Sequence, residues 1–298
     1  MKFGIGLIPQ KNLSEIIEWA KLSENVGFEY LWLSDYPNSK TYEFLKKIAL
    51  ETENIKIVHG VTNPYIKSPN RISAEIINLN KISCNRSILG ISPGNKSIAD
   101  QLNIPWEKPI LTLKQSIKII KQELTQKNQN NIPIYIEAQS KRVIKLSKVI
   151  ADGILINASH PKDYEDLLTQ DTMPKVDIGA YTSTSVGLDY ESAKNAARVV
   201  VAFILAGSSP ITLKRHNIPL TISENIKVEL SQGNIGGAIH LVKDDYLDIF
   251  SVTGTPNDII EKINILKEAG VTQFIVSAPI GKDINNSIKL FGDIISSF

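Results

Sequence analysis

Short apolar runs alternate with amphipathic stretches along the whole chain. Apolar and β-branched runs bounded by turn-forming residues predict strands, and stretches with apolar residues three or four positions apart predict helices. The runs that predict strands span residues 2–9, 28–34, 55–60, 86–92, 132–138, 153–159, 175–186 and 272–278.

Capping residues mark several helix boundaries. Asn12, with Glu15 three positions later, predicts the start of the first helix, and Gly27 predicts its end. Thr255 followed by Pro256 predicts the start of a helix near the C-terminus. Further helices are predicted over 42–52, 71–82, 110–124, 141–150, 191–207 and 285–298.

The order of these elements predicts an α/β protein with a (β/α)8 TIM barrel, because eight strands alternate with helices in 298 residues. An open doubly wound sheet would carry G-x-G-x-x-G after its first strand, and residues 5–11, IGLIPQK, do not match it. No Pro- or Ser-rich linker divides the chain, so a single domain over 1–298 is expected. The stretch 187–250 is expected to be a helical insertion before the eighth strand.

The composition narrows the class of protein. Apolar residues make up 42% and charged residues 21%, and the formal net charge is +2, so neither nucleic acid nor a membrane is expected as a partner. Cys84 is the single cysteine, which excludes an intrachain disulfide and fits a reducing compartment. The chain starts without a signal-peptide pattern, and no apolar run reaches the roughly 18 residues of a membrane span. A cytoplasmic protein is expected.

In a barrel of this kind the active site lies at the carboxyl ends of the strands. The residues expected there are mostly amides, hydroxyls and glycines, and Asp35 and Glu137 are the only acids among them. No cluster of histidines and carboxylates has the spacing of a metal site, so no metal is expected. A neutral rim of this composition suits a bound cofactor that brings its own reactivity.

Ser140 precedes Lys141 and Arg142 at a predicted helix start. The simpler interpretation is a helix cap by the serine hydroxyl. The alternative is an anion site, because free amides at a helix start and two neighbouring cations attract a phosphate group.

The four histidines have structural interpretations beside functional ones. His59 lies within a predicted strand, where a packed or hydrogen-bonded core residue is usual, and His240 is expected to be structural. His160 either begins a helix or contacts a substrate. His216, within LKRHNI, is expected on a solvated charged face, with an anionic ligand tail as the alternative.

The stretch HGVTNPY, residues 59–65, departs from ordinary turn chemistry. Stiff β-branched Val61 and Thr62 follow Gly60, where turn-forming residues are expected after a strand. From the residues alone, a plain turn with Val61 in the core is the simplest interpretation.

Several longer motifs resemble a known family. They are GVTNPY, WEKP, LINASHPKD, VVAFILAGSS, LKRHNI, TGTPNDIIEKI and AGVTQFIVSAPIG, and the similarity runs in the same order from the first residue to the C-terminus. Together they resemble the coenzyme F420-dependent methylenetetrahydromethanopterin reductases of the bacterial-luciferase-like superfamily. TGTP alone is common in that superfamily, whereas NASHPKD together with VAFILAGSS is more particular.

The resemblance implies a deazaflavin site around the third strand. It implies a non-prolyl cis peptide between Gly60 and Val61, with Val61 as an apolar backing for the cofactor ring. The family's acid after the second strand matches Asp35, which implies a hydrogen bond to that ring. Further cofactor contacts are expected for Thr62, Asn63, Gly94, Ala138, Gln139, Ser140 and Asn157.

The chemistry that the resemblance implies is hydride transfer from reduced F420 to the methylene carbon of a tetrahydropterin. Glu137 is the remaining acid for proton transfer, and Tyr36, His160 and Thr182 are expected to contact the substrate. FMN is the alternative cofactor. A homo-oligomer, dimer or tetramer, is implied by the resemblance alone.

The chain also departs from the family pattern. Gly6 stands where the family has a glutamate near the pterin, and Tyr36 stands where it has a histidine. Residues 92–95, Ser-Pro-Gly-Asn, replace Gly-Ala-Gly-Asp. Two alternatives therefore stay open beside the reductase: a luciferase-like FMN-dependent monooxygenase, and a non-catalytic flavin- or deazaflavin-binding paralogue.

Overall fold

The computed structural model describes residues 1–9, 12–165 and 176–298, which form two compact units. The first unit comprises the described residues up to 157 together with 176–180 and 271–275. The second unit comprises 158–165, 181–270 and 276–298. The single-domain organisation expected from the sequence stays a prediction.

The first unit contains a closed ring of eight strands. Neighbours from β1 to β7 pair in parallel, and β9 lies between β7 and β1 in the strand order. At the closing position, Lys2 N–H donates to the Thr272 carbonyl oxygen, and Thr272 N–H donates to the carbonyl oxygen of Ile178. The ring confirms the predicted (β/α)8 barrel. Its strands are β1 (Lys2–Leu7), β2 (Tyr30–Leu33), β3 (Lys56–Thr62), β4 (Ser87–Ile91), β5 (Ile134–Glu137), β6 (Gly153–Ile156) and the first residues of β7 (Asp177–Val186) and β9 (Gln273–Ile280).

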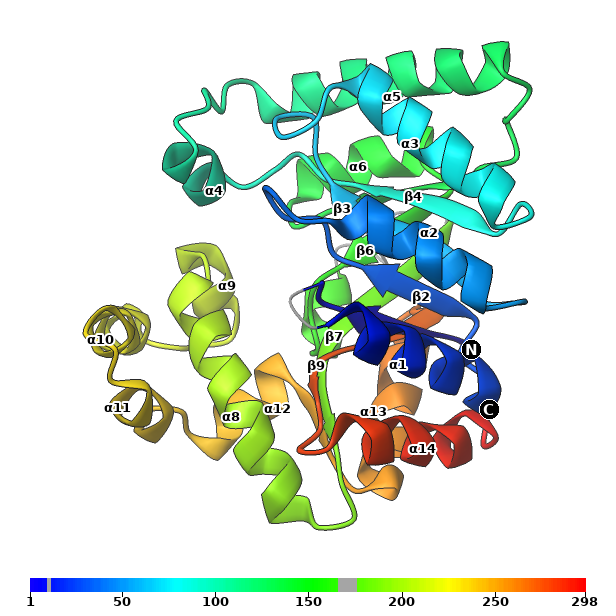
Figure 1. The fold of residues 1–298 in the computed structure, drawn as a ribbon. Helices are drawn as coiled ribbons and strands as arrows, with labels where there is room; N and C mark the ends of the chain where they lie inside the picture. Colours follow the sequence, from blue (N-terminus) through cyan, green and yellow to red (C-terminus); the bar gives the residue numbers. More distant parts are fainter. Residues whose placement is uncertain (10–11, 166–175) are drawn as a thin grey trace. The chain divides into compact units, whose positions relative to one another are not determined.

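Helices of the first unit pack on the outside of this ring (Figure 1). The first one begins and ends as predicted, because the Asn12 side chain accepts from the Ser14 N–H and Gly27 adopts the left-handed conformation. Contacts join α1 to α2, α2 to α3, and α3 to α5. The helices are α1 (Leu13–Val26), α2 (Thr41–Glu51), α3 (Pro69–Ile82), α4 (Lys96–Gln101), α5 (Pro109–Gln126) and α6 (Lys141–Ile150).

Two aromatic side chains fill the middle of the ring by packing on glycines. The Trp32 and Tyr135 rings meet edge to face with their centroids 5.6 Å apart. A β carbon on Gly153 would lie 2.3 Å from the Tyr135 ring, and one on Gly4 or Gly90 would lie 3.2 Å from the Trp32 indole. The glycines therefore make room for the two large rings, and the interior is a packed core.

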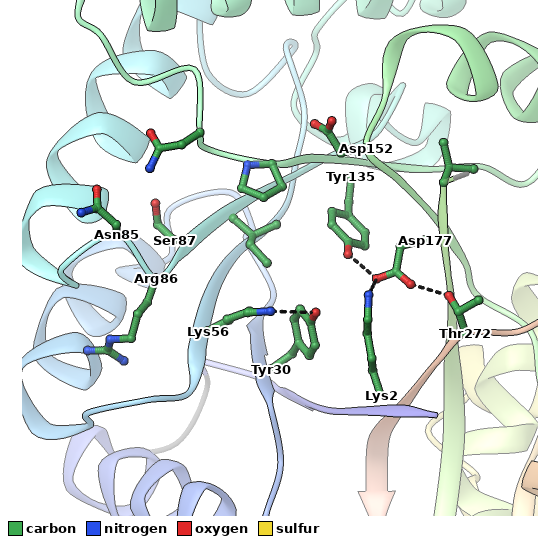
Figure 2. A pocket seen from close by; sticks show the side chains of 14 residues that line it. Lys2, Tyr30, Lys56, Asn85, Arg86, Ser87, Tyr135, Asp152, Asp177 and Thr272 are labelled. Atoms are coloured by element: carbon green, nitrogen blue, oxygen red, sulfur yellow. Dashed lines mark hydrogen bonds and ion pairs between the residues drawn. The ribbon is translucent and has the colours of Figure 1, made fainter. Parts of the chain in front are cut away.

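Asp177 joins several strands at the amino-terminal end of the ring (Figure 2). Its carboxylate accepts hydrogen bonds from Lys2 Nζ at 3.0 Å, from the Tyr135 hydroxyl at 2.5 Å and from the Thr272 hydroxyl. Burial opposes ionisation of Asp177, but these hydrogen bonds outweigh it and hold the pKa of the carboxyl below its usual value. The Asp177 carboxylate thus links Lys2, near the start of the sequence, to Thr272, near its end.

The second unit is mostly helical, as predicted for 187–250. Buried side chains from five helices form one apolar core, which includes Val201, Leu213, Ile226, Ala238 and Leu247. The helices are η1 (Pro161–Tyr164), α8 (Tyr190–Gly207), α9 (Pro210–Arg215), α10 (Leu220–Ser231), α11 (Ile235–His240), α12 (Asp244–Phe250), α13 (Pro256–Glu268) and α14 (Ile284–Ile295).

The sequence misses one strand of the second unit. β8 (Val252–Gly254) pairs in parallel with the end of β7, where Thr184 lies opposite Val252. A strand of three residues is too short to give a periodic hydrophobic signal. The described residues therefore contain one strand more than the eight predicted, although the ring itself has eight.

Most predicted strand boundaries agree with the structure to within a few residues. β3 continues to Thr62, past the strand end predicted at Gly60. β7 begins at Asp177, and Lys175, which the sequence assigned to that strand, lies outside the described residues. None of the helices in the described ranges has both the length and the apolar character needed to cross a membrane.

Candidate active site

The carboxyl ends of the strands in the first unit carry the predicted rim. Trp32 and Tyr135 meet inside the ring, and a side chain two positions further along a strand faces the same side. Glu137 therefore faces the ring interior at the end of β5. Gly6 is the register partner of Trp32, so it faces the interior as well. Glu137 and Gly6, where the resemblance implies a glutamate, thus both face the interior of the ring.

Glu137 is half-buried, and its Oε1 accepts a hydrogen bond of 3.2 Å from Gln139 Nε2. Burial raises the pKa of Glu137 above its usual value, and the bond from Gln139 offsets only part of that effect. Among the described carboxyls whose pKa departs from its usual value, Glu137 alone is shifted upward. It holds a proton to higher pH than an exposed glutamate, as a general acid requires.

The Gly60–Val61 peptide bond is cis, as the resemblance implies. It lies where the register of β3 against β4 shifts, between His59 and Thr62. A β carbon on Gly60 would lie 2.7 Å from the Gly90 carbonyl oxygen, so glycine is needed for this backbone approach. Val61 Cγ1 lies 3.2 Å from the β-carbon position of Gly90, on the interior side of the ring. This apolar group is the one that the resemblance assigns as backing for a cofactor.

Two hydrogen bonds through residues 106 and 107 tie together the segments that follow β3 and β4, and a third bond fixes the turn after β3. The Asn63 side chain accepts from the Tyr65 N–H at 3.1 Å, which fixes the turn after β3. The Tyr65 hydroxyl donates to the Glu107 carbonyl oxygen at 2.6 Å. Trp106 Nε1 donates to the Pro93 carbonyl oxygen at 3.0 Å. The WEKP motif (106–109) therefore holds both segments in place.

Asp35 lies in a buried network of charged side chains. Its Oδ2 lies 3.2 Å from His59 Nε2 and 2.8 Å from Lys67 Nζ. Lys67 Nζ also lies 3.0 Å from Glu75, which pairs in turn with Arg71. Burial opposes ionisation of Asp35, but the bonds to His59 and Lys67 outweigh it and hold its pKa far below the usual value. Asp35 is thus engaged by its own chain, and the contact to a cofactor ring stays a prediction.

The sequence does not single out Lys67 or Glu75 as part of the site. The spacing of four between Arg71 and Glu75 is a local signal for an ion pair on one helix face. No local pattern links Lys67 to Asp35, because the two residues belong to different elements.

Two buried polar atoms near the Gly60–Val61 bond lack a hydrogen-bond partner among the described residues. They are His59 Nδ1 and Thr62 Oγ1. Because ionised Asp35 only accepts, His59 Nε2 carries the hydrogen of this bond. His59 itself is fully buried and hydrogen-bonded, as predicted.

The start of α6 confirms the predicted cap. Ser140 Oγ accepts from the Val143 N–H at 3.4 Å. The Arg142 N–H, in the first turn, has no acceptor inside the helix. The second interpretation of this segment, an anion site, is compatible with the cap, because the serine satisfies only one of the first-turn amides.

The other predicted contacts lie in different surroundings. Tyr36 is 39% exposed, Asn157 is exposed and Gly94 is half-buried, all in the first unit. His160 and Thr182 belong to the second unit. His160 Nδ1 accepts from the Lys162 N–H at 3.1 Å, which confirms that it begins a short helix. Thr182 Oγ1 lies 2.7 Å from Thr184 Oγ1.

The solvated face predicted for His216 is wrong. His216 is only 9% exposed, and its Nε2 lies 3.0 Å from Asp163 Oδ1. Arg215 binds the same oxygen at 2.9 Å, and the His160 ring packs edge to face on His216 with centroids 5.0 Å apart. The partner, Asp163, lies 53 positions away, so no local pattern marks the pair.

The closed ring with helices outside it and a rim of small polar residues defines a class of barrel enzymes. The family model for luciferase-like monooxygenases matches residues 1–273, and the chain belongs to this family. Within it, the chain is similar to 5,10-methylenetetrahydromethanopterin reductases. It is 40% identical to that of Archaeoglobus fulgidus and 37% identical to that of Methanolobus tindarius, with 98% of each chain covered in both comparisons.

A solved structure supports the same relationship. The coenzyme F420-dependent tetrahydromethanopterin reductase from Methanopyrus kandleri matches with a TM-score of 0.93 and 32% identity. The match covers 100% of this chain and 99% of that one. The resemblance stated from the motifs and the predicted fold class are both confirmed.

Proposed function

We propose that this protein is a coenzyme F420-dependent oxidoreductase that reduces methylene-tetrahydromethanopterin, or a related tetrahydropterin, to its methyl form. The similarity to the solved reductase along the whole chain carries this proposal. In the reaction, a C–H bond forms at the methylene carbon, one C–N bond of the methylene bridge breaks, and the released nitrogen takes up a proton. Bound reduced F420 supplies the hydride, and the chain must position the reactants, exclude water and handle the proton.

The residues of the first unit fit a planar cofactor with a polar edge and a phosphate. The Thr62 hydroxyl is buried and without a partner in the described ranges, so it is available to hydrogen-bond the edge of a ring. Val61 offers an apolar surface beside it. The first turn of α6 after Ser140 offers amides to the phosphate. Asn63, Gly94, Ala138, Gln139 and Asn157 complete the proposed cofactor contacts.

Glu137 is proposed to deliver the proton to the released nitrogen. It faces the interior that Gly6 also faces, and its raised pKa keeps it protonated to higher pH than an exposed glutamate. Glu137 would therefore supply the acid that Gly6 lacks. Tyr36, His160 and Thr182 remain proposed substrate contacts.

A non-catalytic deazaflavin-binding protein is the second candidate, and Gly6 is the observation that favours it. Glycine can neither hold nor protonate a substrate nitrogen. The third candidate, an FMN-dependent monooxygenase, is favoured by the wider family to which the chain belongs.

Anaerobic assays separate these candidates. Reduced F420, protein and methylene-tetrahydromethanopterin are mixed, and the absorbance of the deazaflavin reports its oxidation. Turnover supports the reductase, and F420 binding without turnover supports the second candidate. FMN binding with oxygen consumption under air supports the third. Failure to bind F420 would contradict the proposal.

We also propose that the protein is cytoplasmic and self-associates. The single cysteine, Cys84, is free and exposed, which fits a reducing compartment. Sedimentation analysis measures the oligomeric state, and a monomer at micromolar concentration would contradict self-association.

A further inference from the structure

A cavity of about 610 Å³ opens at the amino-terminal end of the ring in the first unit (Figure 2). It lies at the strand ends opposite to the proposed cofactor site. Most of the residues that line it are polar or charged, and none of the residues proposed for cofactor or substrate is among them. The cavity is therefore separate from the proposed active site.

Hydrogen-bond donors from three consecutive strands meet in this cavity. Tyr30 on β2 is the register partner of Lys56 on β3. Lys2 on β1 lies two residues before Gly4, the register partner of Tyr30. Figure 2 shows the side chains of Lys2 and Lys56 reaching into the cavity on either side of Tyr30. Strand register thus brings two ammonium groups and a phenol together.

The Tyr30 hydroxyl has a hydrogen available to donate to a ligand. Its oxygen accepts a hydrogen bond of 3.1 Å from Lys56 Nζ, which also lies 4.6 Å from the centroid of the Tyr30 ring. Because the oxygen already accepts from an ammonium, the hydroxyl hydrogen is left for another partner. Lys56 has no carboxylate partner in the described part of the chain. No carboxylate of the described residues therefore pairs with its charge.

The carboxylates of the cavity are already engaged. Asp177 accepts from Lys2, Tyr135 and Thr272. Asp152 accepts from a backbone N–H at 2.8 Å. Both carboxylates therefore already accept hydrogen bonds from the protein itself.

The charged residues of the lining also favour an anion as the ligand. Its lining holds three cations, Lys2, Lys56 and Arg86, and two carboxylates, Asp152 and Asp177, which leaves a net charge of +1. Arg86 gives its hydrogen bonds to backbone carbonyls and one hydroxyl, not to a carboxylate. Glu24 interacts electrostatically with Arg86, so Lys56 is the cation of the lining for which the described residues supply no carboxylate partner.

We propose that the cavity binds a tetrahedral oxyanion of the phosphate type, held by Lys56, the Tyr30 hydroxyl and Lys2. Two ammonium groups and a phenol suit a dianion with several acceptor oxygens better than a planar monoanion. The ligand is either inorganic phosphate or sulfate, or the phosphate group of a small molecule. This site is independent of the proposed reductase activity.

Calorimetric titration with inorganic phosphate at low ionic strength tests the proposal on the full chain. Lys56→Met is expected to raise the dissociation constant about tenfold or more, because a hydrogen bond to a charged group is lost. Tyr30→Phe removes only the hydroxyl and is expected to weaken binding by a smaller factor. Lys47→Met is the matched control, since Lys47 is exposed on α2 and is not among the residues that line the cavity. It is expected to leave binding unchanged.

The titration is repeated with sulfate and with glycerol 3-phosphate to identify the source of the oxyanion. It is also repeated with the protein saturated in F420, so that phosphate bound at the cofactor site does not contribute. Equal phosphate affinity in wild type, Lys56→Met and Tyr30→Phe would overturn the proposal, as would no binding at millimolar phosphate. If Lys56→Met does not fold, Tyr30→Phe decides the outcome.

Discussion

The backbones of Gly60 and Gly90 approach so closely that a β carbon on Gly60 would lie 2.7 Å from the Gly90 carbonyl oxygen. The obstacle is backbone in a neighbouring strand, which a side-chain rotation cannot relieve. Gly60→Ala is therefore expected to lower the free energy of unfolding by about 2 kcal/mol, the usual cost of overpacking. Urea titration of the two proteins measures the difference.

Gly207→Ala is the control for this substitution, because a β carbon at Gly207 would meet no atom within 4 Å. It is expected to leave the unfolding midpoint unchanged or slightly raised, because alanine favours a helix more than glycine does. An unchanged midpoint for Gly60→Ala as well would show that the strands can separate at this point without cost.

The carboxylate of Asp177 predicts an acid dependence of stability. Hydrogen bonds hold its folded pKa below the unfolded value of about 3.9. Its contribution is therefore fully present above the unfolded pKa and is lost as pH falls through the lower folded pKa. Asp177→Asn is expected to cost about 2 kcal/mol at neutral pH, and the loss relative to wild type should shrink below about pH 4.

Thermal unfolding between acidic and neutral pH measures this effect. Asp293→Asn is the matched control, because Asp293 is exposed on α14. A constant difference between Asp177→Asn and wild type across the whole pH range would argue against the proposed ionisation.

Glu137 predicts a pH profile for the proposed reaction. If the protonated form delivers the proton, kcat falls as pH rises through the raised pKa of Glu137. Glu137→Gln is expected to lower kcat about a hundredfold and to remove this limb of the profile, while F420 binding changes little. Steady-state kinetics across pH and a fluorescence titration with F420 give both quantities.

Glu53→Gln serves as the control for Glu137→Gln, since Glu53 is exposed. The dependence of kcat on pH for Glu53→Gln should be the same as that of wild type. If kcat of Glu137→Gln still falls with rising pH as it does in wild type, a group other than Glu137 causes that fall.

The Asp35–Lys67 pair separates two roles for Asp35. If Asp35 acts by holding the segment after β3 through Lys67 and His59, then Asp35→Asn and Lys67→Met should weaken F420 binding equally. Each should also cost about 3 kcal/mol of stability, because each removes one partner of a buried ion pair.

The double variant decides this question. Losses in F420 affinity that do not add indicate a role through the pair. If Asp35→Asn weakens F420 binding far more than Lys67→Met, the direct contact to the cofactor ring implied by the family is the better interpretation.

Local signals in the sequence were sufficient for most elements of this fold. Asn12, Ser140 and Thr255 were predicted as helix caps, and each acts as one. A cap is decided within one helical turn, so neighbouring residues carry the information. The cis peptide was different, because the residues alone favoured a plain turn and only the family resemblance indicated it.

Interactions between distant residues could not be predicted in this way. Lys2 reaches Asp177 across 175 positions, and His216 reaches Asp163 across 53. Both pairs depend on strand order and helix placement, which no local pattern encodes. The same reason explains why the cavity between Lys2, Tyr30 and Lys56 was not anticipated.

The ring closes between the first strand and the last one, and this has a consequence during synthesis. β1 gains its second neighbour only after Thr272 and the residues that follow it, which come after about nine-tenths of the 298 residues, have been made and have left the ribosome. Until then one side of β1 offers unpaired amides and carbonyls to any other strand in reach. A ribosome stalled shortly before residue 272 should therefore carry a nascent chain that is prone to aggregate. Synthesis and release of the complete chain should remove this tendency.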